Sequence, residues 1–398
     1  MEPVSSKTGG KAPLFTIPFI TVVILYMLDG GIGMMTTSLV TEYARTLGAD
    51  LKLASTVAGL MSLASLFVCP FAGVISDRID RKRLLIYINI GYGICLILHF
   101  FVKSIGMLMA LRLLTGVFFS FVSVTCMAYI SSFIPKERMG EGMGYAAMAS
   151  VLSQAFGPGI GFAIADNVSY RAAFLVAGLI AFGCILGYLL VPYHEEPKPK
   201  VQKGQFRLSN LFAVEFTSFM LLAAIFSAGN SLVTTYLKSI AAERGIERIA
   251  LFYTLYSVVM IVLKPISGKL QDRFGVYPIL IPSVFFAAAG MALIGIGGSL
   301  PFFLGAAVCK AFGQGNGTPS VQANAVKALD RSRAGVAVST IQIGQNIGNA
   351  LAPIIGGFVV TRFGYEATFV GDGVLILAAG LFLVTLQYMQ EKKRKVSV

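Results

Sequence analysis

Long apolar runs recur along this chain of 398 residues, and they restrict its fold more than any other feature. Each run has about 20 residues, the length of helix that crosses the hydrocarbon core of a bilayer. Because lipid offers the backbone no hydrogen-bond partner, each run is predicted to form one α-helix. We count twelve predicted crossings, near residues 13–37, 52–75, 84–102, 106–132, 142–165, 170–192, 211–237, 249–270, 278–298, 301–325, 336–361 and 366–389.

The composition indicates the same class of protein. Hydrophobic residues make up 56% of the chain and charged residues only 13%, which excludes a water-soluble globular protein. The 32 Lys and Arg against 19 Asp and Glu give a net charge of +13. In a membrane protein such an excess marks cytoplasmic loops, so we expect no nucleic-acid partner. The five cysteines lie inside apolar runs and are interpreted as reduced core residues, and we expect no metal site.

The distribution of positive charge predicts the orientation. An even number of crossings places both termini on one side of the membrane. That side carries 21 Lys and Arg residues, the opposite side carries 8, and three more lie within predicted helices. Because cytoplasmic loops are the positively charged ones, both termini are predicted to be cytoplasmic.

Features of the first half of the chain return 195 residues later in the second half. Pro158 returns as Pro353, and a Gly-x-x-x-Asp-Arg segment that starts at Gly73 returns at Gly268. Several separated features in one register indicate a duplicated unit. The predicted domains are an N-terminal six-helix bundle (1–192), a cytoplasmic linker rich in charge and proline (193–210), and a C-terminal six-helix bundle with a short basic tail (211–398).

One segment carries a resemblance to a known family. Residues 73–83, GVISDRIDRKR, are similar to the loop signature between the second and third helices of the major facilitator superfamily. With the helix count, the linker and the repeat, the resemblance extends over nearly the whole chain. It implies two pseudo-symmetric bundles that rock about a substrate site near the midplane. Asp80 departs from the family pattern, which usually has glycine at this position.

The resemblance also assigns a gating role to the two copies of this loop. Asp77 would accept hydrogen bonds from the amides that begin the eleventh helix, near Gly335, and so stabilise the outward-open state. Arg78 and Arg81 would add charge pairs. The alternative is a solvated charge cluster that only fixes topology. The predicted gating residues are Gly73, Asp77, Arg78, Arg81, Gly268, Asp272 and Arg273.

A second signature lies in the fifth predicted helix. Gly157, Pro158 and Gly161 resemble the motif of antiporters and exporters in this superfamily, although Ser153 and Phe162 replace glycines. Small residues let two helices approach closely, and proline removes one backbone hydrogen bond and bends the helix. We assign these three residues and Pro353 to helix packing. The alternative is packing that carries no information on transport direction.

Two ionisable residues within predicted helices are candidates for proton coupling. A charge at the bilayer centre costs about 2.5–3.5 kcal/mol on lenient scales, so such residues usually have a function. Asp29 lies in the first predicted helix and Arg112 in the fourth, at similar predicted depth, so the two are expected to pair. Asp29 would exchange a proton, with Arg112 as its countercharge. The alternative is an ion pair that only fixes helix packing.

Polar and aromatic residues within the helices are candidates for substrate binding. Four amide residues of the eleventh helix fall on one face, which is expected to line the central cavity. Lys310 would either bind an anionic group or act as a second coupling charge. Lys264 and Asp372 lie near helix ends, where hydration is expected. The predicted substrate-binding residues are Tyr26, Phe119, Asn230, Tyr256, Lys310, Gln314, Gln342, Gln345, Asn346 and Asn349.

These features predict an all-α membrane protein with 12 transmembrane helices in two six-helix bundles. Its resemblance to bacterial drug/proton antiporters implies export of amphipathic organic molecules, driven by a proton gradient without a bound cofactor. It would act as a monomer in the bacterial inner membrane. The alternatives are a transporter of sugars, metabolites, organic anions or lipids by symport or uniport, and a receptor or intramembrane enzyme. The chain carries no HExxH, GxSxG or nucleotide-binding motif that would favour an enzyme.

Overall fold

The computed structural model describes residues 13–135, 138–192, 217–328 and 334–396. Within these ranges the chain is helical and contains no strand. The helices are α1(Ile17–Thr46), α2(Leu51–Arg78), α3(Arg81–Leu98), the short 3₁₀ turn η1(His99–Phe101), α4(Ile105–Ser132), α5(Met139–Asn167), α6(Tyr170–Leu190), α7(Thr217–Glu243), α8(Ala250–Phe274), α9(Tyr277–Ile296), α10(Leu300–Phe312), α11(Gln314–Ala328) and α12(Ala334–Val396).

Every predicted apolar run overlaps a helix of the structure. The tenth run covers both α10 and α11, which meet at Gly313. The last two runs lie within α12, which is broken at Gly364, where φ is 82°. In the described part of the chain, nine helical segments are long and apolar enough to cross a membrane. The number of crossings, twelve, stays a prediction.

Side-chain caps define several helix starts. The Asp50 carboxylate accepts a hydrogen bond from the Leu53 amide at the start of α2, with a distance of 2.9 Å. The Asp80 carboxylate accepts one from the Arg83 amide at the start of α3, at 2.8 Å. An N-cap of this kind satisfies an amide that has no partner inside the helix. The carboxylate that departs from the family signature therefore caps α3.

Helix boundaries repeat at the offset found in the sequence. α4 begins at Ile105 and α10 at Leu300, 195 residues later. α5 begins at Met139 and α12 at Ala334, again 195 residues later. The break of α12 at Gly364 falls directly before Tyr365, which corresponds to Tyr170 at the start of α6. The linker between the predicted halves lies outside the described residues, so the domain boundaries stay a prediction.

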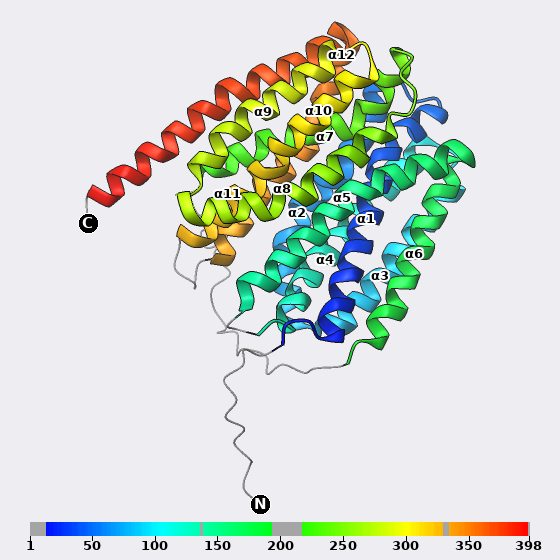
Figure 1. The fold of residues 1–398 in the computed structure, drawn as a ribbon. Coiled ribbons are helices and arrows are strands. Elements are labelled where there is room, and N and C mark those ends of the chain that lie inside the picture. Colours follow the sequence, from blue (N-terminus) through cyan, green and yellow to red (C-terminus); the bar gives the residue numbers. More distant parts are fainter. Residues whose placement is uncertain (1–12, 136–137, 193–216, 329–333, 397–398) are drawn as a thin grey trace, which may run out of the picture.

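The early and late helices occupy different sides of the molecule. Figure 1 shows α1, α3, α4 and α6 on one side and α9 to α12 on the other, with α5, α7 and α8 between them. The two sets meet where α2 packs against α12 and α5 packs against α8. At the first contact a Cβ atom on Gly59 would lie 2.5 Å from the Ala350 carbonyl oxygen, so only glycine fits there.

The outside of the bundle is apolar. Leu190 is 82% exposed and Phe67 is 65% exposed, and many other large apolar side chains point outward. A water-soluble protein rarely shows so much apolar surface, whereas lipid tails cover it without cost.

Candidate functional site

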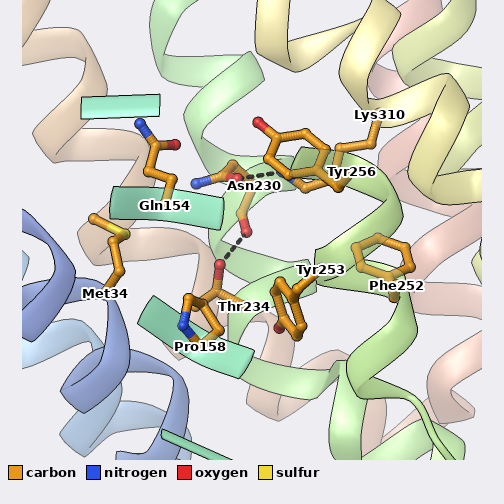
Figure 2. Close-up of a pocket in the computed structure, with 9 residues that line it drawn as sticks. All are labelled: Met34, Gln154, Pro158, Asn230, Thr234, Phe252, Tyr253, Tyr256 and Lys310. Carbon is orange, nitrogen blue, oxygen red and sulfur yellow. Dashed lines mark hydrogen bonds between the residues drawn. The ribbon is translucent and has the colours of Figure 1, made fainter. Parts of the chain in front are cut away.

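A narrow cavity lies between the two sets of helices. Figure 2 shows its lining, which comes from α1 and α5 on one side and from α7, α8 and α10 on the other. Its volume is about 10 Å³, close to the space that one water molecule needs. The lining residues are Met34, Gln154, Pro158, Asn230, Thr234, Phe252, Tyr253, Tyr256 and Lys310.

Lys310 is the charged residue of this lining, and α10 carries it into the interior, where it is 6% exposed. Its ammonium group donates a hydrogen bond to Asn230 Oδ1. The same ammonium nitrogen lies 4.5 Å from the centre of the Tyr256 ring, in a cation–π contact. Thr234 Oγ1 donates to the backbone carbonyl of Asn230, one turn earlier in α7, at 2.9 Å.

The opposite wall of the cavity comes from α5. Gln154 and Pro158 are four residues apart, so both lie on the same face of this helix (Figure 2). Gln154 is a residue that the sequence pattern did not single out, because its neighbour Ser153 belongs to the helix-packing signature. The Ser153 hydroxyl donates to the Met27 carbonyl at 2.6 Å and joins α5 to α1.

Three of the ten predicted substrate-binding residues, Asn230, Tyr256 and Lys310, line this cavity. Tyr26 instead packs within an apolar cluster of the first six helices. The Phe119 ring lies 6.3 Å from the Tyr92 ring.

The amide face of α12 is not part of this cavity, and its predicted role in substrate binding stays a prediction. Gln342, Gln345, Asn346 and Asn349 are half-buried, and none of them lines this cavity. Asn346 faces Cys69 of α2. The Asn349 carbonyl accepts a hydrogen bond from Ser231 of α7 at 3.1 Å. Gly348 on the same stretch of α12 packs directly against the α7 backbone, so this part of the helix is taken up by helix contacts.

Asp29 is fully buried inside the first six helices. The Tyr188 hydroxyl of α6 donates to Asp29 Oδ2 at 2.8 Å. The other carboxylate oxygen, Oδ1, is buried and has no hydrogen-bond partner among the described residues. Asp29 is absent from the lining of the cavity between the helix sets, so the acid is separated from that space in this conformation.

The expected pair between Asp29 and Arg112 is wrong for this structure. Arg112 is also fully buried, but its Nη2 donates to Thr37 Oγ1 at 3.5 Å. Its Nε and Nη1 have no partner within the described ranges. Thr37 follows Asp29 by eight residues, which is about 12 Å along a helix axis. Helix order alone predicts a similar depth for both charges, but Arg112 contacts α1 two helical turns away from Asp29.

Comparison with known proteins decides the family. A sequence profile described as the Major Facilitator Superfamily matches residues 21–250 and 219–397, which together span nearly the whole chain. The chain belongs to the Major Facilitator Superfamily. Its members are transporters, and the many apolar helices make this one a multi-pass membrane protein.

Relatives in this superfamily include multidrug transporters. The chain is 27% identical over 325 residues to the multidrug resistance protein MdtG of Proteus mirabilis, covering 77% of this chain and 79% of that protein. It is 26% identical over 359 residues to the multi-drug resistance efflux pump PmrA of Streptococcus pneumoniae, covering 85% and 88%. The crystal structure of the nucleoside transporter NupG aligns with a TM-score of 0.71 at 12% identity, covering 94% and 99%, and shows the same fold.

The superfamily loop signature is described only in part. The side chains of Asp77, Arg78 and Asp272 lie outside what the structure describes. Arg81 donates to the Ala128 carbonyl at 3.0 Å and to Ser132 Oγ at 2.9 Å, and so ties the loop to the end of α4.

The remaining members of the two signature copies show few contacts. Arg273 is exposed beside the Phe274 ring. Gly73 would accommodate a Cβ atom without contacting any neighbour, and Gly268 lies within α8. The gating role of these residues therefore stays a prediction.

The antiporter-like signature of α5 lies against α1. A Cβ atom on Gly157 would be 2.6 Å from the Gly31 carbonyl oxygen, and one on Gly161 would be 2.6 Å from Met35 Cγ. Pro158 faces the cavity. In the second copy, the Pro353 carbonyl accepts a hydrogen bond from the Tyr236 hydroxyl at 2.7 Å.

Asp372 is half-buried, whereas the sequence predicts a hydrated residue near a helix end. Its Oδ2 atom is buried and has no partner in the part of the chain that the structure describes. It lies against Gly229 of α7 together with the Gln314 side chain, whose two polar atoms are likewise unpaired among the described residues. Two turns of helix separate Asp372 from the break at Gly364, and this depth buries its Oδ2 atom.

Proposed function

We propose that this chain is a proton-coupled secondary transporter that exports amphipathic organic molecules by alternating access. The observation that supports this most directly is the cavity that both helix sets build, with amide, hydroxyl, aromatic and ammonium groups in its wall. A few polar groups among aromatic side chains are typical of sites for small organic ligands. The relatives MdtG and PmrA support export as the direction.

The cavity must widen before it can hold such a molecule. Its volume of about 10 Å³ is far below the roughly 300–1,000 Å³ of ordinary ligand pockets. Because the lining comes from both helix sets, rocking one set against the other enlarges this space without unfolding a helix. The conformation is therefore a closed one, in which the aromatic side chains of α8 fill the site.

Asp29 is the proposed site of proton exchange. A buried carboxylate is costly to keep charged unless a cation compensates it. A conformational change that brings water or a cation to Asp29 Oδ1 changes this cost, and so couples proton uptake or release to the movement of α1 and α6. Tyr188 transmits the coupling, because its hydroxyl contacts both Asp29 and, at 3.3 Å, Cys126 of α4.

The remaining elements of the proposal follow from the charge distribution and the relatives. Both termini lie in the cytoplasm of a bacterium, the protein sits in the inner membrane as a monomer, and the proton gradient supplies the energy without a bound cofactor. Moving one charge through about 100 mV provides about 2.3 kcal/mol. A substrate-dependent rise in proton concentration on the trans side would instead indicate symport, and no proton movement would indicate uniport.

The test uses the purified protein in proteoliposomes that contain a pH indicator. A panel of toxic organic compounds is first screened for growth protection on overexpression, and a protective compound is then the transported substrate. Asp29→Asn should reduce substrate-driven proton movement at least tenfold while leaving folded protein. Asp372→Asn is the matched control, since it removes another buried acid from the other helix set, and it should keep proton movement near the wild-type rate.

Wild-type coupling in Asp29→Asn would remove Asp29 from the mechanism. Loss of coupling in Asp372→Asn alone would place proton exchange in the second helix set and contradict the proposal. Size-exclusion chromatography of each variant shows whether a loss of transport reflects a loss of folded protein.

A further inference from the structure

Within the part of the chain that the structure describes, the positive charge of Lys310 has no acidic partner. Among the nine residues that line the cavity, the other eight are uncharged. The direct partners of the ammonium group are the Asn230 amide and the Tyr256 ring, both neutral. Two ion pairs that the structure describes, Arg45 with Glu42 and Lys238 with Asp166, do not involve Lys310.

A buried cation whose partners are all neutral lacks the opposite charge that normally accompanies it. Buried charges in proteins are normally paired, because removing an ion from water is costly unless an opposite charge compensates it. The amide oxygen and the aromatic face compensate only part of the charge. The ammonium group therefore retains affinity for an anion that enters from the cavity.

The other polar groups of the wall favour the same kind of ligand. Asn230 uses its amide oxygen to accept from Lys310, which leaves its amide NH₂ group as a donor. Figure 2 shows this nitrogen directed away from Lys310, toward the side of the cavity where Gln154 lies. Carboxylates accept several such hydrogen bonds, and bonds to a charged acceptor are stronger than neutral ones.

We propose that the substrates of this transporter are organic anions, with a carboxylate or similar singly charged group bound to Lys310 and Asn230. The uncharged part of the molecule would lie among Phe252, Tyr253 and Tyr256 of α8. This inference rests on the proposed function, since it names the substrate class of the same cavity. It excludes ammonium-bearing drugs as preferred substrates, because their charge repels Lys310 in a poorly hydrated space.

A binding experiment on the purified protein in lipid nanodiscs, without a proton gradient, tests this inference. The probes share one ring system and differ in charge: 2-naphthoate, 2-naphthamide and 2-naphthylmethylammonium. 2-Naphthoate should bind at least tenfold more tightly than 2-naphthamide, and the ammonium compound should bind most weakly. Lys310→Arg should keep this order, whereas in Lys310→Met the affinity for 2-naphthoate should fall to that for 2-naphthamide.

Lys264→Met is the matched control. The sequence predicts that Lys264 extends to the membrane surface, but its ammonium group donates to the Gly315 carbonyl at 3.1 Å inside the bundle. It does not line the cavity. Removing this second interior lysine should therefore leave the preference for 2-naphthoate unchanged, and chromatographic behaviour shows that both variants are folded.

Three results would overturn the inference: equal or absent binding of 2-naphthoate and 2-naphthamide, preference for the ammonium compound, or loss of the preference in Lys264→Met but not in Lys310→Met. The proposed function is tested separately, because binding is measured without a gradient. Proton-driven export of a neutral or cationic compound would leave the proposed function intact while this inference fails. Selective anion binding without any proton coupling would leave this inference intact while the proposed function fails.

Discussion

The two halves of the molecule share a scaffold but not their interior charges. The first half buries Asp29 and Arg112, and the positions 195 residues later are Ala224 and Ala307. The second half carries Lys310 into the cavity, and the corresponding position of the first half is Thr115. The repeat therefore preserves helix boundaries and prolines, while these interior ionisable residues differ between the two halves.

The difference indicates that the two halves have different roles. The acid of the first half is sealed within its own helices and contacts Tyr188, whereas the cation of the second half faces the shared cavity. We infer that the first half senses protons and the second half recognises substrate. In this proposal, rocking of one half against the other would link the two events, since α1 carries Asp29 and also contributes Met34 to the cavity wall.

The largest expected effect comes from a packing difference between the halves. Gly157 of the first half corresponds to Ala352 of the second. A Cβ atom at position 157 would lie 2.6 Å from the Gly31 carbonyl oxygen, and backbone cannot yield as a side chain does. Gly157→Ala should destabilise the protein by about 2–4 kcal/mol, seen as a lower thermal unfolding midpoint in detergent.

Gly73→Ala is the control for this change, because a Cβ atom at position 73 meets no neighbour within 4 Å. It should leave the unfolding midpoint unchanged or raise it slightly, as Ala favours a helix more than Gly does. Equal stability of Gly157→Ala and the wild type would show that the α1–α5 contact is looser than described, and that the two halves tolerate the same residue.

A smaller effect is expected when Tyr188, the hydrogen-bond partner of the buried Asp29, is changed. Tyr188→Phe removes the hydroxyl that donates to Asp29 at 2.8 Å, and this bond favours the ionised carboxylate. The pH at which proton-coupled transport is half-maximal should therefore move upward by roughly one unit, because a hydrogen bond to a charged group contributes about 1.5 kcal/mol or more. Transport rates across a pH series in proteoliposomes give the midpoint.

Tyr129→Phe controls for the loss of a buried phenol. The Tyr129 hydroxyl of α4 is buried and has no hydrogen-bond partner among the residues described, so its removal should leave the pH midpoint in place. A pH profile that is identical in Tyr188→Phe and the wild type would show that the charge state of Asp29 does not limit transport. The proposed proton-sensing role of the first half would then fail.

The sequence predicts the scaffold well for a physical reason. A run of about 20 apolar residues has one stable form in lipid, and repeated anchors such as Pro158 and Pro353 fix the register of the two halves. The direction in which a side chain points from its helix axis is harder to predict. The amides of α12 share a face, but none of them lines the cavity, and Gly348 beside them packs against α7, which is a contact between distant segments.

The depth of a charged residue in the membrane is also hard to predict from the sequence. The sequence places Asp372 near a hydrated helix end, yet its Oδ2 atom is buried beside Gln314 and Gly229. Lys310 can be recognised because a charged group in the middle of an apolar run is unusual at any depth. Gln154 escapes recognition because its neighbour Ser153 already accounts for the local motif. Charges in helices can thus be recognised from sequence, while their partners require the packed structure.

The smallest expected effect concerns the two charges of the first half. A double-mutant cycle with Asp29→Asn and Arg112→Gln measures their interaction through the free energy of unfolding. Asp29 and Thr37, the residue that Arg112 contacts, are two helical turns apart, about 12 Å along the axis. At that separation and an effective dielectric constant of about 20, the coupling should be about 1.4 kcal/mol, against about 4 kcal/mol for charges about 4 Å apart. A coupling near the larger value would mean that the two side chains form the ion pair that the structure does not show. Arg112 would then be the direct countercharge of Asp29, and the first half would hold a closed pair rather than an acid that responds to protons through Tyr188.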